Sequence, residues 1–188
     1  LFTKEAAGNR NFFGITTDKQ GYLWAGTFSH LYRIDRKTRD IRPYTVAPNT
    51  VVETTLEDSH GRFWVGGNNG LYRYDYDNER FTSFHLPQYD EYNPRVFRIY
   101  EDVRKGIWIG TQGYLANIKP SGETEIWHEL PTDKKNKVKL RSVGTIQRDA
   151  QGAMWIGMLH GLVYWPTDRK NAQLFLNNPK DVKSLISN

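Results

Sequence analysis

Short segments in which apolar and polar residues alternate recur along this chain, and a period of two is the pattern of half-buried β-strands. The stretch from Asp58 to Asp75, DSHGRFWVGGNNGLYRYD, shows the arrangement most clearly. It contains a polar turn, an alternating segment around a tryptophan, a Gly-rich connection and a second alternating segment. The segment VVETTLED precedes the stretch and RFTSFH follows it. The whole unit is therefore predicted to form four short antiparallel strands.

The unit occurs four times. Its tryptophans are separated by 40, 44 and 47 residues: Trp24, Trp64, Trp108 and Trp155. In every copy an Asp stands six residues before the tryptophan, a Gly two residues after it and a Leu seven residues after it. Several columns in one register indicate an internal repeat. A four-stranded sheet repeated at this period is typical of a propeller blade, which buries its faces only against neighbouring blades. The four tryptophans are accordingly predicted to lie in the core between blades.

The predicted fold class is all-β, with four four-stranded antiparallel blades. We place the blades at 11–46, 47–92, 93–138 and 139–178. Residues 1–10 are interpreted as the remnant of a preceding blade or a tail, and 179–188 as the lead-in to a further blade. The chain is therefore expected to be a fragment of a propeller with more than four blades.

The first two strands of each copy are joined by an Asp-led turn: DKQG, DSHG or DAQG. In such turns the Asp side chain accepts hydrogen bonds from backbone amides, and Gly supplies a positive φ. The shared turn register predicts that the four Asp carboxylates cap the backbone and do not form catalytic pairs. In the third copy Lys105 stands where Gly is expected, which predicts a different turn conformation there. The Gly after each tryptophan is predicted to make room for an aromatic side chain of another blade.

Composition narrows the function classes. There is no cysteine, which excludes disulfides and thiolate metal sites, and no run of 18 apolar residues that could span a membrane. The formal charge of +5 comes from interspersed charges, so no nucleic-acid partner is expected. One basic run stands out, and it is interpreted as a solvated loop in preference to a site for an acidic ligand: Lys134, Lys135, Lys137, Lys139 and Arg141.

The blocks TLEDSHGRFWVGGNNGLYRYD and TIQRDAQGAMWIGMLHGLVYW, with the linking NNPKDVKSLISN, resemble the two-component regulator propeller repeat. The resemblance covers essentially the whole chain. Such repeats form the extracytoplasmic sensor region of hybrid histidine kinases, commonly as two seven-bladed propellers followed by a β-sandwich and a membrane helix. Many of these sensors respond to oligosaccharides. The resemblance therefore implies a periplasmic ligand-sensing segment of a seven-bladed propeller, whose contacts with the membrane and with a second copy run through segments absent here.

Candidate binding residues are sought in the connections from second to third strand and from fourth strand to the next blade, which gather on one face of a propeller. Two of the latter are long, 86–95 and 130–141. Aromatic faces stack on sugar C–H surfaces, and Arg can hydrogen-bond hydroxyls or a uronate carboxylate. The candidate ligand-binding residues are Tyr89, Tyr92, Arg95, Arg98, Arg141, His30, Asn69, Gln112 and His160. The alternative interpretation is that these are solvated loop and inner-strand residues.

No catalytic residue, metal ligand or cofactor is predicted from the sequence. Its five histidines show no metal-ligand spacing, and neither G-x-S-x-G nor a Gly loop leading into a helix occurs. The predicted function is sensing of an oligosaccharide or other small ligand, without enzymatic activity in this segment. Two alternatives stay open: a propeller lyase with a histidine base supplied by His30 or His160, and a structural or protein-interaction propeller.

Overall fold

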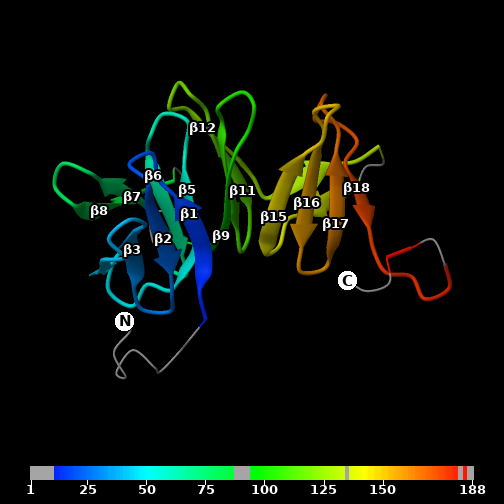
Figure 1. The fold of residues 1–188 in the computed structure, drawn as a ribbon. Helices are drawn as coiled ribbons and strands as arrows, with labels where there is room; N and C mark the ends of the chain where they lie inside the picture. The colour runs from blue at the N-terminus through cyan, green and yellow to red at the C-terminus, as the bar shows by residue number, and fades with distance from the viewer. Residues whose placement is uncertain (1–10, 87–93, 134–135, 182–183, 186–188) are drawn as a thin grey trace. The chain divides into compact units, whose positions relative to one another are not determined.

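The computed structural model describes residues 11–86, 94–133, 136–181 and 184–185. These residues form strands, turns and loops, and none of them lies in a helix, so no helix that could cross a membrane occurs in the described ranges (Figure 1). The strands assemble into four four-stranded antiparallel sheets and one two-stranded sheet. The all-β fold of four-stranded antiparallel blades predicted from the sequence is confirmed.

The first sheet contains β1 (Phe13–Thr17), β2 (Tyr22–Gly26), β3 (Leu31–Asp35) and β4 (Ile41–Tyr44). The second contains β5 (Val52–Glu57), β6 (Phe63–Gly67), β7 (Gly70–Asp75) and β8 (Arg80–Phe84). The third contains β9 (Val96–Glu101), β10 (Ile107–Thr111), β11 (Leu115–Ile118) and β12 (Thr124–Trp127). The fourth contains β15 (Val143–Arg148), β16 (Met154–Met158), β17 (Gly161–Trp165) and β18 (Gln173–Phe175). In each sheet the strands lie side by side in chain order.

The chain forms two compact units, residues 1–99 and 100–188. Connections in an antiparallel sheet with strands in chain order alternate between its two edges. The edge with the Asp-led turns also carries the turns between third and fourth strands, and we call it the turn edge. The opposite edge carries the connections between second and third strands and those after the fourth strand, and we call it the loop edge.

Pro43 lies exposed on β4, an outer edge strand where a missing amide donor costs little.

In the first unit the core between the two blades is aromatic. Trp24 is fully buried, with ring centroids 4.7 Å from Phe63 and 5.0 Å from Tyr74 of the second blade. Aromatic rings at these separations gain from both area burial and ring geometry. The placement predicted for this tryptophan, in the core between blades, is confirmed.

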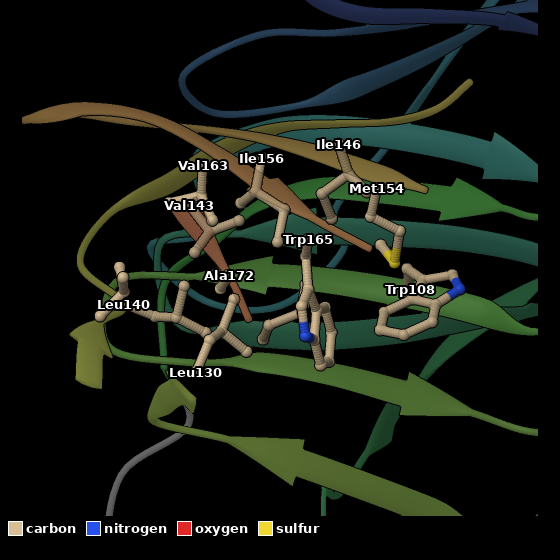
Figure 2. Packing of buried hydrophobic residues seen from close by; sticks show 12 residues of the cluster. Trp108, Leu130, Leu140, Val143, Ile146, Met154, Ile156, Val163, Trp165 and Ala172 are labelled. Carbon is tan, nitrogen blue, oxygen red and sulfur yellow. The ribbon is translucent and has the colours of Figure 1, made fainter. Parts of the chain in front are cut away.

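The second unit repeats this arrangement with a different set of side chains. Trp108 packs in one cluster with Met154 and Trp165 of the fourth blade, and its ring centroid lies 6.4 Å from that of Trp165. Figure 2 shows Trp165 between Trp108 on one side and Leu130 on the other. Trp127 of the third blade stacks on Trp108 at 5.5 Å, so the cluster is built around three indole rings.

The glycine after the tryptophan makes room for a valine in the first three copies and for Thr145 in the fourth, so the prediction of an aromatic neighbour is wrong. A Cβ atom on Gly66 would lie 2.5 Å from Val96 Cγ1, and one on Gly110 would lie 2.8 Å from Val143 Cγ1. Each valine begins the first strand of the next blade. The short β-branched side chain fills the space because the first strand of that blade approaches the glycine closely.

The basic run does not form a solvated loop throughout. Glu129–Pro131 (β13) and Lys137–Lys139 (β14) pair as an antiparallel hairpin between the third and fourth blades. Leu130, Val138 and Leu140 are buried in the cluster of the second unit, whereas Lys137 and Lys139 are exposed. Alternation of basic and apolar residues makes this segment a strand with one buried face.

The turn between β9 and β10 has the same conformation as its counterparts, so the prediction of a different one is wrong. The Lys105 amide donates to the Asp102 carbonyl at 2.9 Å, as the Gly61 amide donates to the Asp58 carbonyl at 2.8 Å. Lys105 has a φ of 66°, close to the 78° of Gly61. The lysine therefore adopts the left-handed conformation that glycine adopts in the other copies.

Candidate functional site

The turn edge of each blade is organised by a hydrogen bond between the Asp of the turn and the tryptophan six residues later. The indole Nε1 donates to a carboxylate oxygen at 2.6, 2.8, 2.9 and 3.0 Å in the pairs Trp24–Asp18, Trp64–Asp58, Trp108–Asp102 and Trp155–Asp149. The other carboxylate oxygen accepts backbone amides of the turn; Asp58 Oδ1, for example, accepts those of His60 and Arg62, each at 3.0 Å. One side chain thus fixes both the turn and the tryptophan.

The carboxylates of Asp58 and Asp102 on this edge are held ionised. Burial acts to raise the pKa of Asp58, but hydrogen bonds from the Trp64 indole and from the amide and guanidinium of Arg62 outweigh it and keep the pKa below its ordinary value. Burial also acts to raise the pKa of Asp102. Hydrogen bonds from Trp108 and from turn amides, together with the charge of Arg148, outweigh it and keep the pKa below its ordinary value. Their oxygens are occupied by donors, so these carboxylates act as structural acceptors and not as acid–base pairs.

The loop edge of the first unit holds two of the candidate residues. Asn69 Oδ1 accepts from Thr50 Oγ1 and from the Tyr72 hydroxyl, each at 3.0 Å, and its Nδ2 donates to the Pro48 carbonyl at 3.2 Å. The side chain of Asn69 thus clamps two neighbouring connections. His30 is half-buried. Its Nδ1 lies 2.8 Å from Ser29 Oγ, and its Nε2 takes no part in this contact.

Two arginines lie at the start of the first strand of the third blade. Arg95 Nε and Nη2 donate to the same Glu53 oxygen at 2.9 and 2.5 Å, and the guanidinium lies 4.9 Å from the centroid of the Phe97 ring. Arg98 is exposed on β9. Tyr89 and Tyr92 lie outside the described residues.

The loop edge of the second unit brings Gln112 next to Arg141. The Ser142 amide donates to the Gln112 carbonyl at 2.7 Å, which joins the β10–β11 connection to the end of the hairpin. Both Gln112 and Arg141 are exposed. His160 is exposed in the turn between β16 and β17. The seven candidate residues that the structure describes are divided between the two units, and a role in ligand binding stays a prediction for all nine.

Among the described residues no group of three or more His, Asp or Glu side chains could hold a metal ion. Sequence reasoning overlooked a basic hollow on the turn edge of the second unit, lined in part by Arg104, Arg148 and Arg169. The sequence carried one signal for this hollow, a change from acidic to basic at one position of the repeat. Arg148 stands seven residues before its tryptophan, where the second and third copies have Glu57 and Glu101.

The family model for the two component regulator propeller matches residues 46–69. The extracellular domain of the hybrid two component system BT4673 from B. thetaiotaomicron superposes with a TM-score of 0.80 at 24% identity, over 95% of this chain and 24% of that one. The corresponding domain of BT3049 from the same organism gives a TM-score of 0.70 at 20% identity, over 94% of this chain and 23% of that one.

A propeller of another kind is also similar: virginiamycin B lyase from Staphylococcus aureus, with a TM-score of 0.67 at 17% identity, over 93% of this chain and 58% of that one. None of the curated proteins matches the chain. This chain spans about a quarter of the length of the two-component domains, which are 24% and 23% covered. At these identities the likeness concerns the fold. The resemblance predicted from the sequence is confirmed: residues 46–69 match the two-component regulator propeller family, and the described residues form four four-stranded antiparallel sheets.

Proposed function

We propose that this chain is a ligand-sensing part of a two-component regulator propeller, located outside the cytoplasm, that recognises an oligosaccharide and contributes to a signal passed across the membrane. The observation that carries the proposal is the match of residues 46–69 to the two component regulator propeller. The similar folds of two extracellular domains assigned to hybrid two component systems support it. The proposal gives the segment a binding role and no reaction to catalyse.

The loop edge is the proposed ligand-binding edge. Arg95 offers a guanidinium beside a half-buried aromatic ring, Phe97, and such a pair suits a sugar that presents both hydroxyl groups and a C–H face. Signalling would follow from differential affinity, because a ligand shifts a receptor only by as much as it prefers one conformation over the other.

The pair between Arg95 and Glu53 permits a sharp test. Arg95→Gln removes the guanidinium, whereas Glu53→Gln removes its carboxylate partner and leaves the arginine in place. We expect calorimetry against neutral and acidic oligosaccharides to show saturable binding that Arg95→Gln weakens about tenfold and Glu53→Gln preserves.

Equal loss in both variants would assign Arg95 a structural role and remove this edge from the proposal. If none of the oligosaccharides binds, and circular dichroism shows that the protein is folded, oligosaccharide sensing itself is overturned. It would favour a propeller that serves as an interaction module.

A further inference from the structure

A small hollow lies on the turn edge of the second unit, between the β9–β10 turn and the fourth blade. Its lining includes Arg104, Arg148, Trp165, Thr167 and Arg169. Its volume is about 10 Å³, close to the least that can hold one water-sized group. Three arginines therefore line a hollow with room for about one water-sized group.

Two of the three arginines at the hollow are paired with carboxylates. Arg148 donates to Asp102 at 3.0 Å and to the Gly152 carbonyl at 2.6 Å, and Arg169 donates to Glu125 at 2.9 Å. Asp149, in the same turn as Gly152, directs its carboxylate to Trp155 and to turn amides. The guanidinium of Arg104 is exposed and makes no ion pair or hydrogen bond with the residues that the structure describes.

Arg148 itself retains an unused donor. Its side chain is 10% exposed, and its Nε has no hydrogen-bond partner among the described residues. A buried N–H group without a partner is costly, so an acceptor brought within reach of this nitrogen would be favourable.

The first unit shows that the fold does not require arginines here. Glu57 occupies the register position of Arg148, and Glu79, the left-handed residue of its turn, corresponds to Arg169. Glu57 accepts from the Lys19 amide at 2.6 Å and from the Tyr76 hydroxyl at 3.2 Å. Two acids at one blade interface are thus replaced by two bases at the other.

We propose that this hollow, the arginine hollow, binds an oxyanion group, a carboxylate or a sulfate, with one oxygen inserted and Arg104 closing on it. Guanidinium groups match the planar geometry of carboxylates and the oxygens of sulfate, and they form charge-assisted hydrogen bonds of high strength. The group can come from an acidic sugar or from a free inorganic anion. The site lies on the edge opposite the loop edge, and it stands whether or not the loop edge binds a sugar.

The test is a titration of the folded protein with sodium sulfate and with glucuronate at constant ionic strength, followed by calorimetry and by NMR of the arginine Nε–H signals. We expect saturable binding, with a shift of the Arg148 Nε–H signal. Arg104→Gln should weaken it about tenfold, because one charge-assisted contact is lost. The matched control is Lys170→Gln, which removes one exposed charge next to Arg169, and it should change the affinity less than about twofold.

Binding of both anions supports a general oxyanion site, and binding of sulfate alone supports a site for a free inorganic anion. If neither sulfate nor glucuronate shows saturable binding, the proposal is overturned. Equal weakening by Arg104→Gln and Lys170→Gln overturns it as well, because that result marks unspecific attraction to net charge.

Discussion

The Arg169 guanidinium donates to Glu125 at 2.9 Å, and this pair reverses the polarity of Arg42 and Glu79, which lie 2.7 Å apart in the first unit. In each pair one residue lies on the fourth strand of a blade, and the other is the left-handed residue in the β-turn of the following blade, with φ of 57° at Arg169 and 48° at Glu79. Arg169 also lies 5.1 Å from the centroid of the Trp127 ring. The contact between neighbouring blades is kept while its two charges are exchanged.

The first unit has the same pair with opposite polarity. Reversal of both charges in the second unit should therefore restore part of the unfolding free energy that Arg169→Glu alone removes. Arg169→Glu places two carboxylates together and removes the cation beside the indole rings, and it should cost about 1–2 kcal/mol of unfolding free energy. Addition of Glu125→Arg should recover about half of this loss. Urea unfolding of the four proteins of the cycle measures the coupling; strictly additive effects would show that the ion pair contributes nothing.

The turn carboxylates should make stability depend on acidity. Asp58 and Asp102 have pKa values below the ordinary value of 3.8, so the unfolded chain takes up protons before the folded one does. Their contribution is complete above about pH 4 and is lost as the pH falls through the folded pKa values. Unfolding free energy measured by urea from pH 6 to pH 3 should therefore decrease most steeply at the acidic end.

Asp58→Asn isolates one of these groups. The amide places a donor opposite the Trp64 indole and the Arg62 guanidinium, and we expect a loss of about 1–3 kcal/mol near neutral pH together with a shallower decrease below pH 4. A variant as stable as the parent, with an unchanged pH profile, would contradict the role assigned to the bond between Asp58 and Trp64.

Lys105→Gly should stabilise the chain by about 0.5–1 kcal/mol. The lysine has a φ of 66°, which costs a residue with a Cβ atom more than it costs glycine. The reciprocal change, Gly21→Ala, introduces the same strain at a φ of 89°, where a Cβ atom would have no neighbour within 4 Å. It should destabilise by a similar amount in thermal unfolding. A loss of stability in Lys105→Gly would show that the lysine side chain contributes a contact that outweighs the strain.

The hairpin should be an integral part of the second unit. Leu130 is fully buried in its cluster (Figure 2), so Leu130→Ala should cost about 2–5 kcal/mol through lost burial and the cavity that remains. Lys139→Ala on the exposed face of the same hairpin is the control, and it should change stability by less than about 0.5 kcal/mol. Similar small effects in both variants would mean that the hairpin is loosely attached.

The turns and strands were accessible to sequence reasoning because they depend on local pattern. Alternation around Trp64 predicted β6, and the Asp-led turn predicted backbone capping by Asp58, which the bonds to the amides of His60 and Arg62 confirm. The alternation of Lys137, Val138 and Lys139 carried the same kind of signal for β14, but the density of lysines favoured a loop interpretation. The turn at Lys105 shows the limit of residue preference, since the closing hydrogen bonds impose a conformation that the side chain disfavours.

By itself the sequence determined the repeat, the β class and the burial of Trp24, because period and register are properties of one strand and its neighbours along the chain. Only the tertiary structure decided which charges meet. Arg148 pairs with Asp102 from 46 positions away, and Arg169 with Glu125 from 44, across an interface between two blades. Such contacts depend on how one sheet packs against the next, and side chains on adjacent blades become neighbours only when that packing forms.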